Sequence, residues 1–417
     1  MLKLNTILKN LGPGLLFASM AIGTSHLVLS TKAGAQYGWL MIIPIVLANV
    51  LKYPFFEFGI RYTNATGKSL IEGYRNRGKG YLWFYAFITL ATGLATPAAL
   101  CSITAGLLIN LLGLQNVSLA LVALGLFIFN SIILIIGKYK LLETTLKFLI
   151  PVLFAALLAT TILVINKGAI TPVTNFEPPK IFDELGILFI ITLIGWMPTA
   201  VEASSWLSLW SVEKYKTNGT KPALKDALQE FNLGYILTAI LAIFFLIIGC
   251  MTLYGSGTEL SGNAITFADQ VINLFTTHIG EWAYVLIAIS AFATMYSTCL
   301  TNHDATARVS IDIIGLLVDE HNKFKGKKYY AMGIIVISIV SLIVLFVLSA
   351  NMGLILAFAT TVSFVLAPIV GYMNLKNVMS EDLLEKQRPK RRLQLLTYIG
   401  VIFLSLVSIY YGWVLMF

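Results

Sequence analysis

Two short interruptions in long apolar stretches carry residue types that could bind a solute or a cation. The first is Gly23-Thr24-Ser25-His26, in the middle of the apolar stretch 12–36. The second is Met197-Pro198-Thr199, in the stretch 185–211. Glycine and proline weaken a helix, and an interrupted membrane helix exposes backbone groups and side chains to a solute. The sequence therefore predicts a substrate-binding site at these interruptions. Its residues are Gly23, Thr24, Ser25, His26, Met197 and Thr199.

His26 and Met197 give this predicted site the ligand types of a soft or borderline metal cation. Imidazole and thioether groups suit such ions, whereas hard divalent ions prefer carboxylate oxygens. Both residues are therefore candidate metal ligands. Neither interruption contains an acid, and the nearest one is Glu202, five residues after Met197.

Glu202 and His26 are the candidate proton carriers. Glu202 lies within an apolar stretch, where an ionised carboxyl is costly and the neutral, protonated form is favoured. His26 carries an imidazole, the group that most readily changes charge near physiological pH. We predict that both residues take part in proton coupling. The alternative is a structural role, through an ion pair or helix cap for Glu202 and a buried hydrogen bond for His26.

Three further charged residues lie in or near apolar stretches. Lys52 belongs to the stretch 38–60 and could pair with Glu202 or Asp304, replace a coupling ion, or snorkel to the membrane surface. Asp304 and Arg308 are four residues apart, so they can pair on one helix face. We predict a gating or structural role for Lys52, Asp304 and Arg308.

The composition indicates an integral membrane protein. Of 417 residues, 58% are hydrophobic and only 12% are charged, about half the charged share of a soluble domain. The net charge of +9 does not indicate nucleic-acid binding, because the basic residues lie in short loops between apolar runs. The three cysteines lack metal-type spacing, and no nucleophilic triad or phosphate-binding loop is present in the sequence. Neither an enzyme nor a cofactor is therefore expected.

Eleven apolar stretches are long enough to cross a bilayer, which predicts an all-α protein with a single transmembrane domain, 1–417. The spans are 12–36, 38–60, 81–110, 117–137, 142–166, 185–211, 232–254, 282–303, 329–349, 353–375 and 393–415. With the N-terminus inside, 24 of the 29 Lys and Arg residues fall on the inner side. This bias predicts that the N-terminus is inside and the C-terminus outside, in a bacterial-type cytoplasmic membrane.

The positions of the interruptions predict an inverted repeat. They fall in spans one and six, so each half of the chain would contain five spans and begin with a broken helix. Five spans per half place the two halves in opposite orientations across the membrane. The predicted halves are 12–166 and 185–375, and 393–415 is an additional helix.

Several motifs resemble those of the natural resistance-associated macrophage protein (Nramp) family of divalent-metal transporters. They are GPGLLFASMA and AGAQYGW in the first span, Leu47-Ala48-Asn49, NATGKSLIEGYR at 64–75, GKYKLLE at 137–143 and Met197-Pro198. The resemblance implies the LeuT-type fold, with eleven or twelve spans, and transport of a metal cation.

The same motifs place different residues where the family has its metal ligands. The family's first-span motif is Asp-Pro-Gly-Asn, and here Gly23 stands at the Asp position and His26 at the Asn position. The family's Met-Pro-His appears as Met197-Pro198-Thr199. The stretch 91–96 lacks the acids of the family's proton path. We therefore expect altered metal selectivity.

Two functions are compatible with these residues. One is a secondary active transporter of metal cations with altered selectivity, with protons as a coupling partner. The alternative is a proton-coupled transporter of a small organic or anionic solute on the same fold, which the missing carboxylates and the hydroxyl-rich first interruption favour. In either case the expected partners are the cargo and the lipid bilayer.

Overall fold

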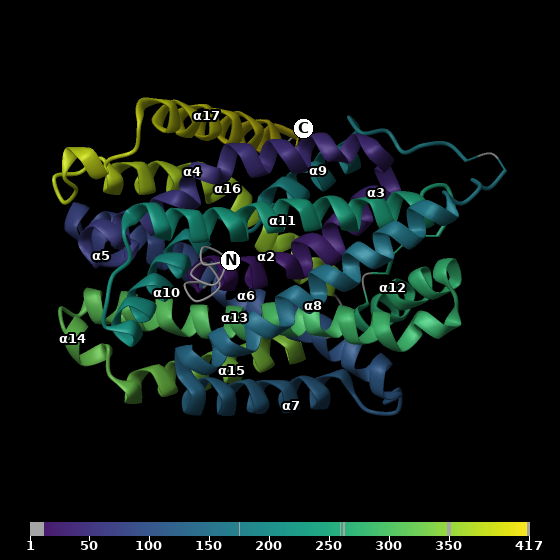
Figure 1. Ribbon diagram of the computed structural model, residues 1–417, viewed down its shortest axis with the longest axis horizontal. Helices are drawn as coiled ribbons and strands as arrows, with labels where there is room; N and C mark the ends of the chain where they lie inside the picture. The colour runs from purple at the N-terminus through teal and green to yellow at the C-terminus, as the bar shows by residue number, and fades with distance from the viewer. Residues whose placement is uncertain (1–11, 175, 259, 262, 348–351, 415–417) are drawn as a thin grey trace, which may run out of the picture.

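The computed structural model describes residues 12–414 apart from 175, 259, 262 and 348–351. Residues 1–11 and the last residues of the predicted spans 329–349 and 393–415 lie outside the described residues. Within the described part of the chain, all regular secondary structure is helical, as predicted. The long helices run roughly alongside one another through the molecule (Figure 1).

The helices follow the predicted spans in order. Up to residue 167 they are α2 (Pro13–Ile22), η1 (Gly23–Ser30), α3 (Thr31–Tyr37), η2 (Gly38–Met41), α4 (Ile42–Thr66), α5 (Leu70–Arg77), α6 (Lys79–Leu112), α7 (Leu119–Ile132), η3 (Ile133–Gly137) and α8 (Lys138–Lys167). Beyond residue 183 they are α9 (Glu184–Trp196), α10 (Ala203–Asn218), α11 (Leu224–Thr252), α12 (Ala264–Ile279), η4 (Glu281–Ala283), α13 (Tyr284–Leu317), α14 (His321–Phe324), α15 (Lys327–Val347), α16 (Met352–Val378), η5 (Glu385–Gln387) and α17 (Arg391–Val414).

Eight helical stretches of the described chain are long and apolar enough to cross a membrane. The first, Pro13–Thr66, has 54 residues, far more than the roughly 20 that a bilayer requires. It therefore contains two spans, and the chain turns between them at Gly38, whose φ is +70°. The broken pair α9 and α10 and the long helix α13 complete the eleven predicted spans.

The first span is interrupted at the predicted residues, but the interruption is not an unwound segment. Gly23–Ser30 forms the π-helix η1, which continues directly from α2 and into α3. A π-helical turn widens the helix and is frequently found at functional sites. The side chains after Gly23 therefore point in other directions than they would in a regular α-helix, while the backbone stays helical throughout.

The sixth span is broken completely. Helix α9 ends at Trp196, α10 begins at Ala203, and the intervening residues 197–202 are not helical. The Met197–Pro198 peptide bond is cis. The break interrupts the helical hydrogen bonding at the C-terminal end of α9, where the only backbone amide of the described chain that donates to the carbonyl of Ile194 is that of Met197, at 3.3 Å.

Glycines allow helix α11 to pack closely along the whole first span. A Cβ atom on Gly249 would lie 2.1 Å from the carbonyl oxygen of Thr31, and one on Gly34 would lie 2.2 Å from that of Leu246. Near the other end, a Cβ atom on Gly234 would lie 2.2 Å from the carbonyl oxygen of Gly14. Small residues permit this backbone approach between membrane helices, and it fixes η1 against α11.

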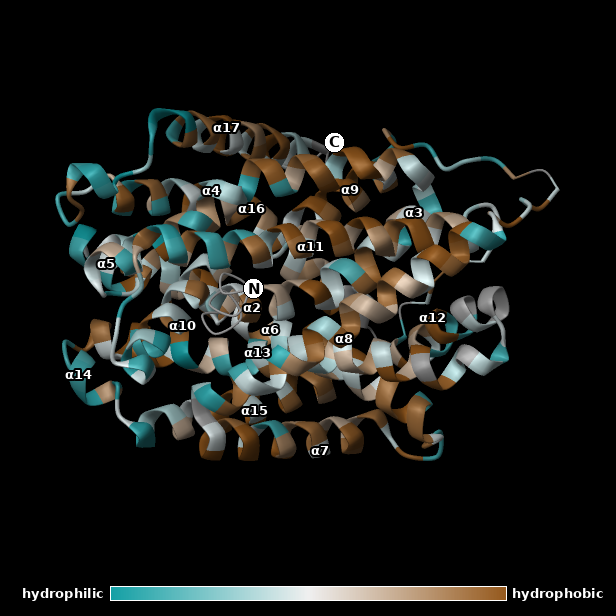
Figure 2. Ribbon diagram, in the orientation of Figure 1, coloured by the Kyte–Doolittle hydropathy of each residue, from teal (hydrophilic) through white to brown (hydrophobic). Residues whose placement is uncertain are grey.

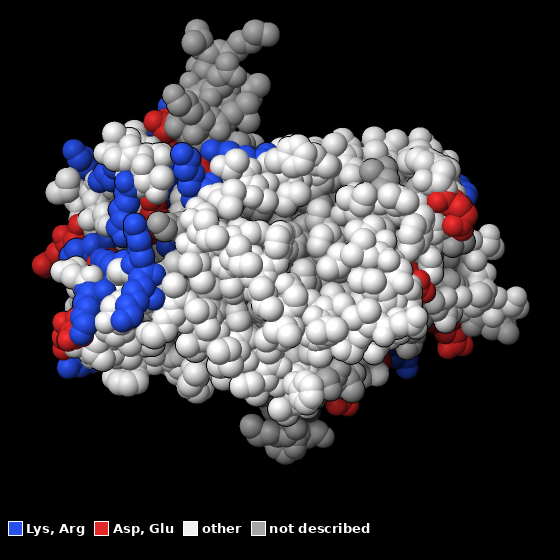
Figure 3. Space-filling view, turned by 90° about the horizontal axis from the view of Figure 1, so that it is seen from below, with Lys and Arg blue, Asp and Glu red and all other residues white. Residues whose placement is uncertain are grey.

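The surface agrees with a membrane-embedded molecule. Apolar residues dominate the outward-facing helices α7 and α17, while hydrophilic residues gather at the end that holds α5 and α14 (Figure 2). Lys and Arg side chains cluster at this same end, and a broad surface without charge follows it (Figure 3). We call this end, with Arg75, Arg77, Lys216 and Lys323 among its residues, the basic end. The amphipathic helix α12, which belongs to none of the predicted spans, lies towards the opposite end (Figure 1).

Candidate functional site

A buried cavity lies where η1, the break in the sixth span, α6 and α13 meet. The cavity volume is about 30 Å³, which is room for about two water molecules or a small ion. Its surface is mainly apolar, but eight of the fifteen residues that line it are polar and uncharged, and seven of these carry hydroxyl groups. These hydroxyls belong to Thr24, Ser25, Thr92, Thr96, Thr199, Thr298 and Thr306. The rest of the wall consists of Met20, Gly93, Leu100, Trp196, Ala200, Glu202, Trp206 and Asn302.

Four polar atoms of this wall have no hydrogen-bond partner in the described structure. They are Thr24 Oγ1, Trp196 Nε1, Asn302 Oδ1 and Thr306 Oγ1. Each belongs to a buried residue. A buried polar group without a partner costs on the order of 1–3 kcal/mol, so these four atoms mark a place where a polar ligand or water belongs.

Glu202 provides the one carboxylate among the residues that line the cavity. It lies in the break, immediately before α10, and is almost fully buried. Its Oε1 atom accepts a hydrogen bond of 2.7 Å from the hydroxyl of Ser363 on α16. Its backbone carbonyl accepts a second one, of 2.9 Å, from Tyr85 on α6. No lysine or arginine nitrogen of the described chain lies within 4.0 Å of this carboxylate.

Of the residues predicted to bind substrate, Thr24, Ser25 and Thr199 line the cavity. Gly23 has a packing role, because a Cβ atom there would lie 2.4 Å from Thr298 Oγ1 on α13. Ser25 links the first span to the break, since its hydroxyl lies 3.0 Å from the carbonyl oxygen of Pro198. These contacts bring the two predicted interruptions together.

His26 does not reach the cavity. Its Nε2 atom lies 2.8 Å from the carbonyl oxygen of Thr238 on α11, and this oxygen can only accept a hydrogen bond. Its Nδ1 atom lies 2.7 Å from the hydroxyl of Ser25, which can donate to it. Both ring nitrogens are therefore occupied by protein groups, and the predicted role of His26 as a metal ligand and proton carrier has no support in this arrangement.

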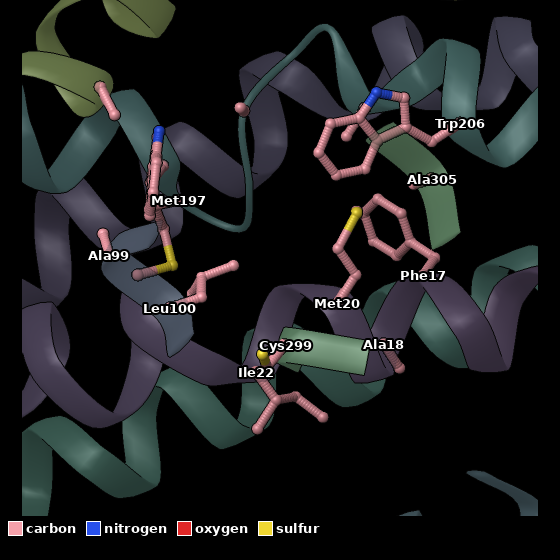
Figure 4. Packing of buried hydrophobic residues seen from close by; sticks show 14 of the residues in the cluster. Phe17, Ala18, Met20, Ile22, Ala99, Leu100, Met197, Trp206, Cys299 and Ala305 are labelled. Carbon is pink, nitrogen blue, oxygen red and sulfur yellow. The ribbon is translucent and has the colours of Figure 1, made fainter. Parts of the chain in front are cut away.

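Met197 also lies outside the cavity lining. Its side chain is fully buried in the apolar core, beside Ala99 and Leu100 of α6, whereas Met20 lies near Phe17 and Trp206 (Figure 4). The cavity thus contains a thioether from the first span instead of the predicted one from the sixth. Met20 lies in the last turns of α2, before the π-helix begins at Gly23, and the sequence carried no signal that it lines the cavity.

Lys52 pairs with neither of the acids considered from the sequence. Within the described chain its Nζ atom forms no ion pair with Glu202 or Asp304. It donates hydrogen bonds to the carbonyl oxygens of Ile194 at 2.6 Å and Gly195 at 2.7 Å. Lys52 therefore caps the C-terminal end of α9.

Asp304 and Arg308 form the predicted pair, in a buried network beyond the cavity towards the basic end. Arg308 Nε donates to Asp304 Oδ2 at 2.8 Å, and Trp210 Nε1 of α10 donates to the same oxygen at 2.8 Å. Tyr330 of α15 donates to Asp304 Oδ1 at 2.5 Å. Arg308 also lies 3.4 Å from Glu213 Oε2 on α10. The network joins α10, α13 and α15.

A second network holds the start of the first span. The carboxylate of Glu230 on α11 accepts hydrogen bonds from the backbone amides of Gly12 at 2.7 Å and Gly14 at 2.9 Å. A carboxylate at a helix N-terminus is favoured by the unpaired amides and the helix dipole. This contact ties the first span to the seventh, and the network around Asp304 ties the sixth, eighth and ninth spans, both near the basic end.

The interrupted helices and the buried polar cavity between them define a membrane transporter. The model of the natural resistance-associated macrophage protein-like family matches residues 14–414, and the chain belongs to this family. The predicted family is confirmed, and its members are transporters, not enzymes.

Relatives and solved structures agree with this assignment. An uncharacterized protein of Pasteurella multocida is 33% identical over 399 residues, which cover 95% of this chain and 90% of that protein. The divalent metal cation transporter MntH of Staphylococcus saprophyticus is 24% identical over 323 residues, 74% of this chain and 70% of its own. A manganese transporter of Eremococcus coleocola superposes with a TM-score of 0.72 at 14% identity, covering 97% of this chain and 86% of the other. Transporters of this and other families share the LeuT-type fold with this chain, as predicted.

The buried network around Asp304 leads to a test of stability. We expect Arg308→Met to destabilise the protein by about 3–5 kcal/mol, because it leaves the Asp304 carboxylate buried beside hydroxyl and indole donors only. Adding Asp304→Asn to the same protein should recover much of this loss, since no buried charge then remains. Unfolding of the purified protein in detergent measures both effects. Lys323→Met, which removes an exposed pair with Glu320, is the control and should change nothing measurable. Equal stability of Arg308→Met and the wild type would show that the network does not hold these helices.

Proposed function

We propose that this protein is a secondary active transporter of a metal cation, with altered selectivity, and that Glu202 is the anionic ligand of the cargo. The observation that carries the proposal is the position of Glu202 as the one carboxylate in a buried cavity whose wall has unpartnered oxygen atoms. Family membership supports a metal cargo, as the names of MntH and of the manganese transporter indicate for those relatives.

The donor set favours a hard cation over a soft one. Apart from the thioether of Met20, the cavity offers oxygen atoms, from Glu202, Asn302, Thr24 and Thr306. The described residues contain no group of three or more His, Cys, Asp or Glu residues that could hold a metal ion. A single carboxylate with neutral oxygens suits an ion that keeps part of its water shell, as Mg²⁺ does in proteins. We therefore propose a partly hydrated hard divalent cation as the cargo.

A proton on Glu202 would couple transport to the proton gradient. The ionised carboxylate attracts the cation, while the protonated carboxyl does not, so exchange of one for the other drives binding and release. Ser363 orients the carboxylate by donating a hydrogen bond to its Oε1 atom. We assign this role to Glu202 and not to His26, whose two ring nitrogens are engaged by Ser25 and Thr238.

One observation favours the second candidate, a small polar organic solute. Trp196 Nε1 lines the cavity without a partner, and an indole N–H can only donate, so it cannot ligate a cation. An organic cargo with an acceptor atom would use it, with Trp206 providing an aromatic wall.

Replacing the carboxylate of Glu202 tests the proposed role directly. Glu202→Gln keeps the size and the hydrogen-bonding atoms of the side chain but removes its charge. We expect cation binding by the purified protein to weaken about tenfold or more, a loss of about 1.4 kcal/mol or more, and cation-driven proton flux in liposomes to disappear. Glu177→Gln, at an exposed position between α8 and α9, is the matched control and should leave both unchanged. Normal proton flux in Glu202→Gln would refute the coupling role.

A calorimetric screen separates the two cargo classes. We expect heat of binding with Mg²⁺ or Mn²⁺ and none with amino acids or small carboxylates. Trp196→Phe removes the indole donor and keeps an aromatic ring, so it should leave metal binding unchanged. If an organic solute alone gives heat and Trp196→Phe weakens it, the cargo is organic and the metal proposal fails.

We further propose that the protein lies in a cytoplasmic membrane with its N-terminus inside and its C-terminus outside. The basic end then faces the cytoplasm, as the charge bias of the loops requires. A membrane-impermeant thiol reagent applied to intact cells should label Glu177→Cys and leave Lys323→Cys unlabelled. The native cysteines are all buried, so the unaltered protein gives the background. The reverse labelling pattern would contradict this orientation.

A further inference from the structure

Lys52 is a fully buried lysine in a membrane helix, and no carboxylate neutralises it at contact distance. Its side chain has no exposed surface. No Asp or Glu oxygen within the described chain lies within 4.0 Å of its Nζ atom. The nearest acid on the same helix, Glu57, is already bound by Arg61, whose Nε atom donates to it at 3.0 Å. Among the described residues Lys52 therefore has no ion pair at contact distance, and its electrostatic interaction with Glu202 acts over a longer distance.

The contacts of Lys52 are backbone carbonyl oxygens at the break in the sixth span. Nζ lies 2.6 Å from the oxygen of Ile194, 2.7 Å from that of Gly195 and 3.5 Å from that of Thr199. An ammonium group has three N–H donors, so one lysine serves all three oxygens. The first two oxygens end α9, and the third belongs to a residue that lines the cavity.

Three converging backbone carbonyl oxygens can bind a cation. The last carbonyls of a helix have no intrahelical partner and form the negative end of the helix dipole. In transporters with broken helices, such carbonyls coordinate the coupling cation. Here the position among the oxygens is occupied by a charged nitrogen that is covalently attached to α4.

We propose that Lys52 is a tethered replacement for a coupling cation at the break in the sixth span. Its ammonium group neutralises the C-terminal end of α9, so this position requires no sodium or other free ion. The break therefore keeps one fixed arrangement through the transport cycle. This position adjoins the cavity through Thr199, and the proposal does not depend on which cargo the protein carries.

Helix α16 confirms how tightly the end of α9 is enclosed. A Cβ atom on Gly195 would lie 2.8 Å from the carbonyl oxygen of Thr360. The carbonyls that Lys52 binds therefore lie between α4 and α16, away from the surface. Removal of the ammonium group would leave these oxygens without solvent to replace it.

Chemical rescue of Lys52→Ala tests the proposal without any cargo. The substitution removes Cγ, Cδ, Cε and Nζ, which are together the atoms of n-propylammonium. Thermal unfolding of the purified variant in detergent is measured while n-propylammonium or sodium chloride is added, with N-methylglucamine chloride to hold the ionic strength constant. We expect a Tm loss of several degrees and its saturable recovery by the small cation, because a ligand that binds the folded state alone stabilises it. Neutral 1-propanol should not restore the Tm.

Two further variants separate a charge effect from a packing effect. Lys52→Met fills the same space without charge, so it should also lose stability and should not respond to the cations. Lys147→Ala, which breaks a pair with Glu143 at a half-exposed position, should respond to the salts as the unaltered protein does. In liposomes, transport by the unaltered protein should not change between sodium and N-methylglucamine, whereas Lys52→Ala should transport only with the rescuing cation present.

Three results would overturn the proposal. The first is a Lys52→Met variant as stable and as active as the unaltered protein, since the carbonyls would then need no cation. The second is a folded Lys52→Ala variant that no small cation restores. The third is a Lys52→Ala variant that fails to fold even when purified with n-propylammonium. The thermal measurement contains no cargo. A failed rescue would therefore count against the role of Lys52 and would say nothing about whether the cargo is a metal.

Discussion

The carbonyl groups released where the sixth span breaks are the constraint around which the centre of this protein is organised. In the hydrocarbon region of a bilayer, no water is available to satisfy them, and each unsatisfied group costs several kcal/mol. Lys52 supplies its donors to Ile194 and Gly195 from a neighbouring helix. Ser25 places its hydroxyl beside the carbonyl of Pro198 from the first span. Lys52 thus supplies hydrogen bonds to the break from the second span, and Ser25 lies against it from the first.

The same requirement shapes the cavity beside the break. Hydroxyl groups can donate to a backbone carbonyl of their own helix and still present an oxygen to a cargo. Thr92 does so by donating to the carbonyl of Ile88. The atoms without a partner, among them Thr24 Oγ1 and Asn302 Oδ1, lie where the helices separate. The site is therefore rich in neutral oxygens and contains a single carboxylate, that of Glu202.

Close packing between helices gives this polar centre its rigidity. The glycines on the first span and α11 bring two backbones together, which holds η1 in place. Towards the basic end, Asp304 and Arg308 join three helices through buried hydrogen bonds, and Glu230 caps the start of the first span. A motion that opens this end must either break these networks or move each of them as a rigid group. Breaking them is costly, because it leaves a buried charge without its partner.

The sequence by itself determined the membrane character, the order of the spans, the family and the two places where helices are interrupted. These follow from local composition, since apolar length, loop charge and glycine or proline content act within one segment. The tertiary structure decided which side chains of the interruptions meet. The sequence pattern named Gly23, His26 and Met197 as site residues, yet they pack against protein, and Met20 and Asn302 line the cavity instead.

The physical reason is that the direction of a side chain depends on the turn of its helix and on its neighbours. The π-helix at Gly23–Ser30 rotates the residues that follow it, and no composition rule reports that rotation. The partner of Lys52 was likewise open in the sequence, because a lysine can satisfy its charge with carboxylates or with carbonyls. Only the fold, by placing the end of α9 beside α4, selected the carbonyls.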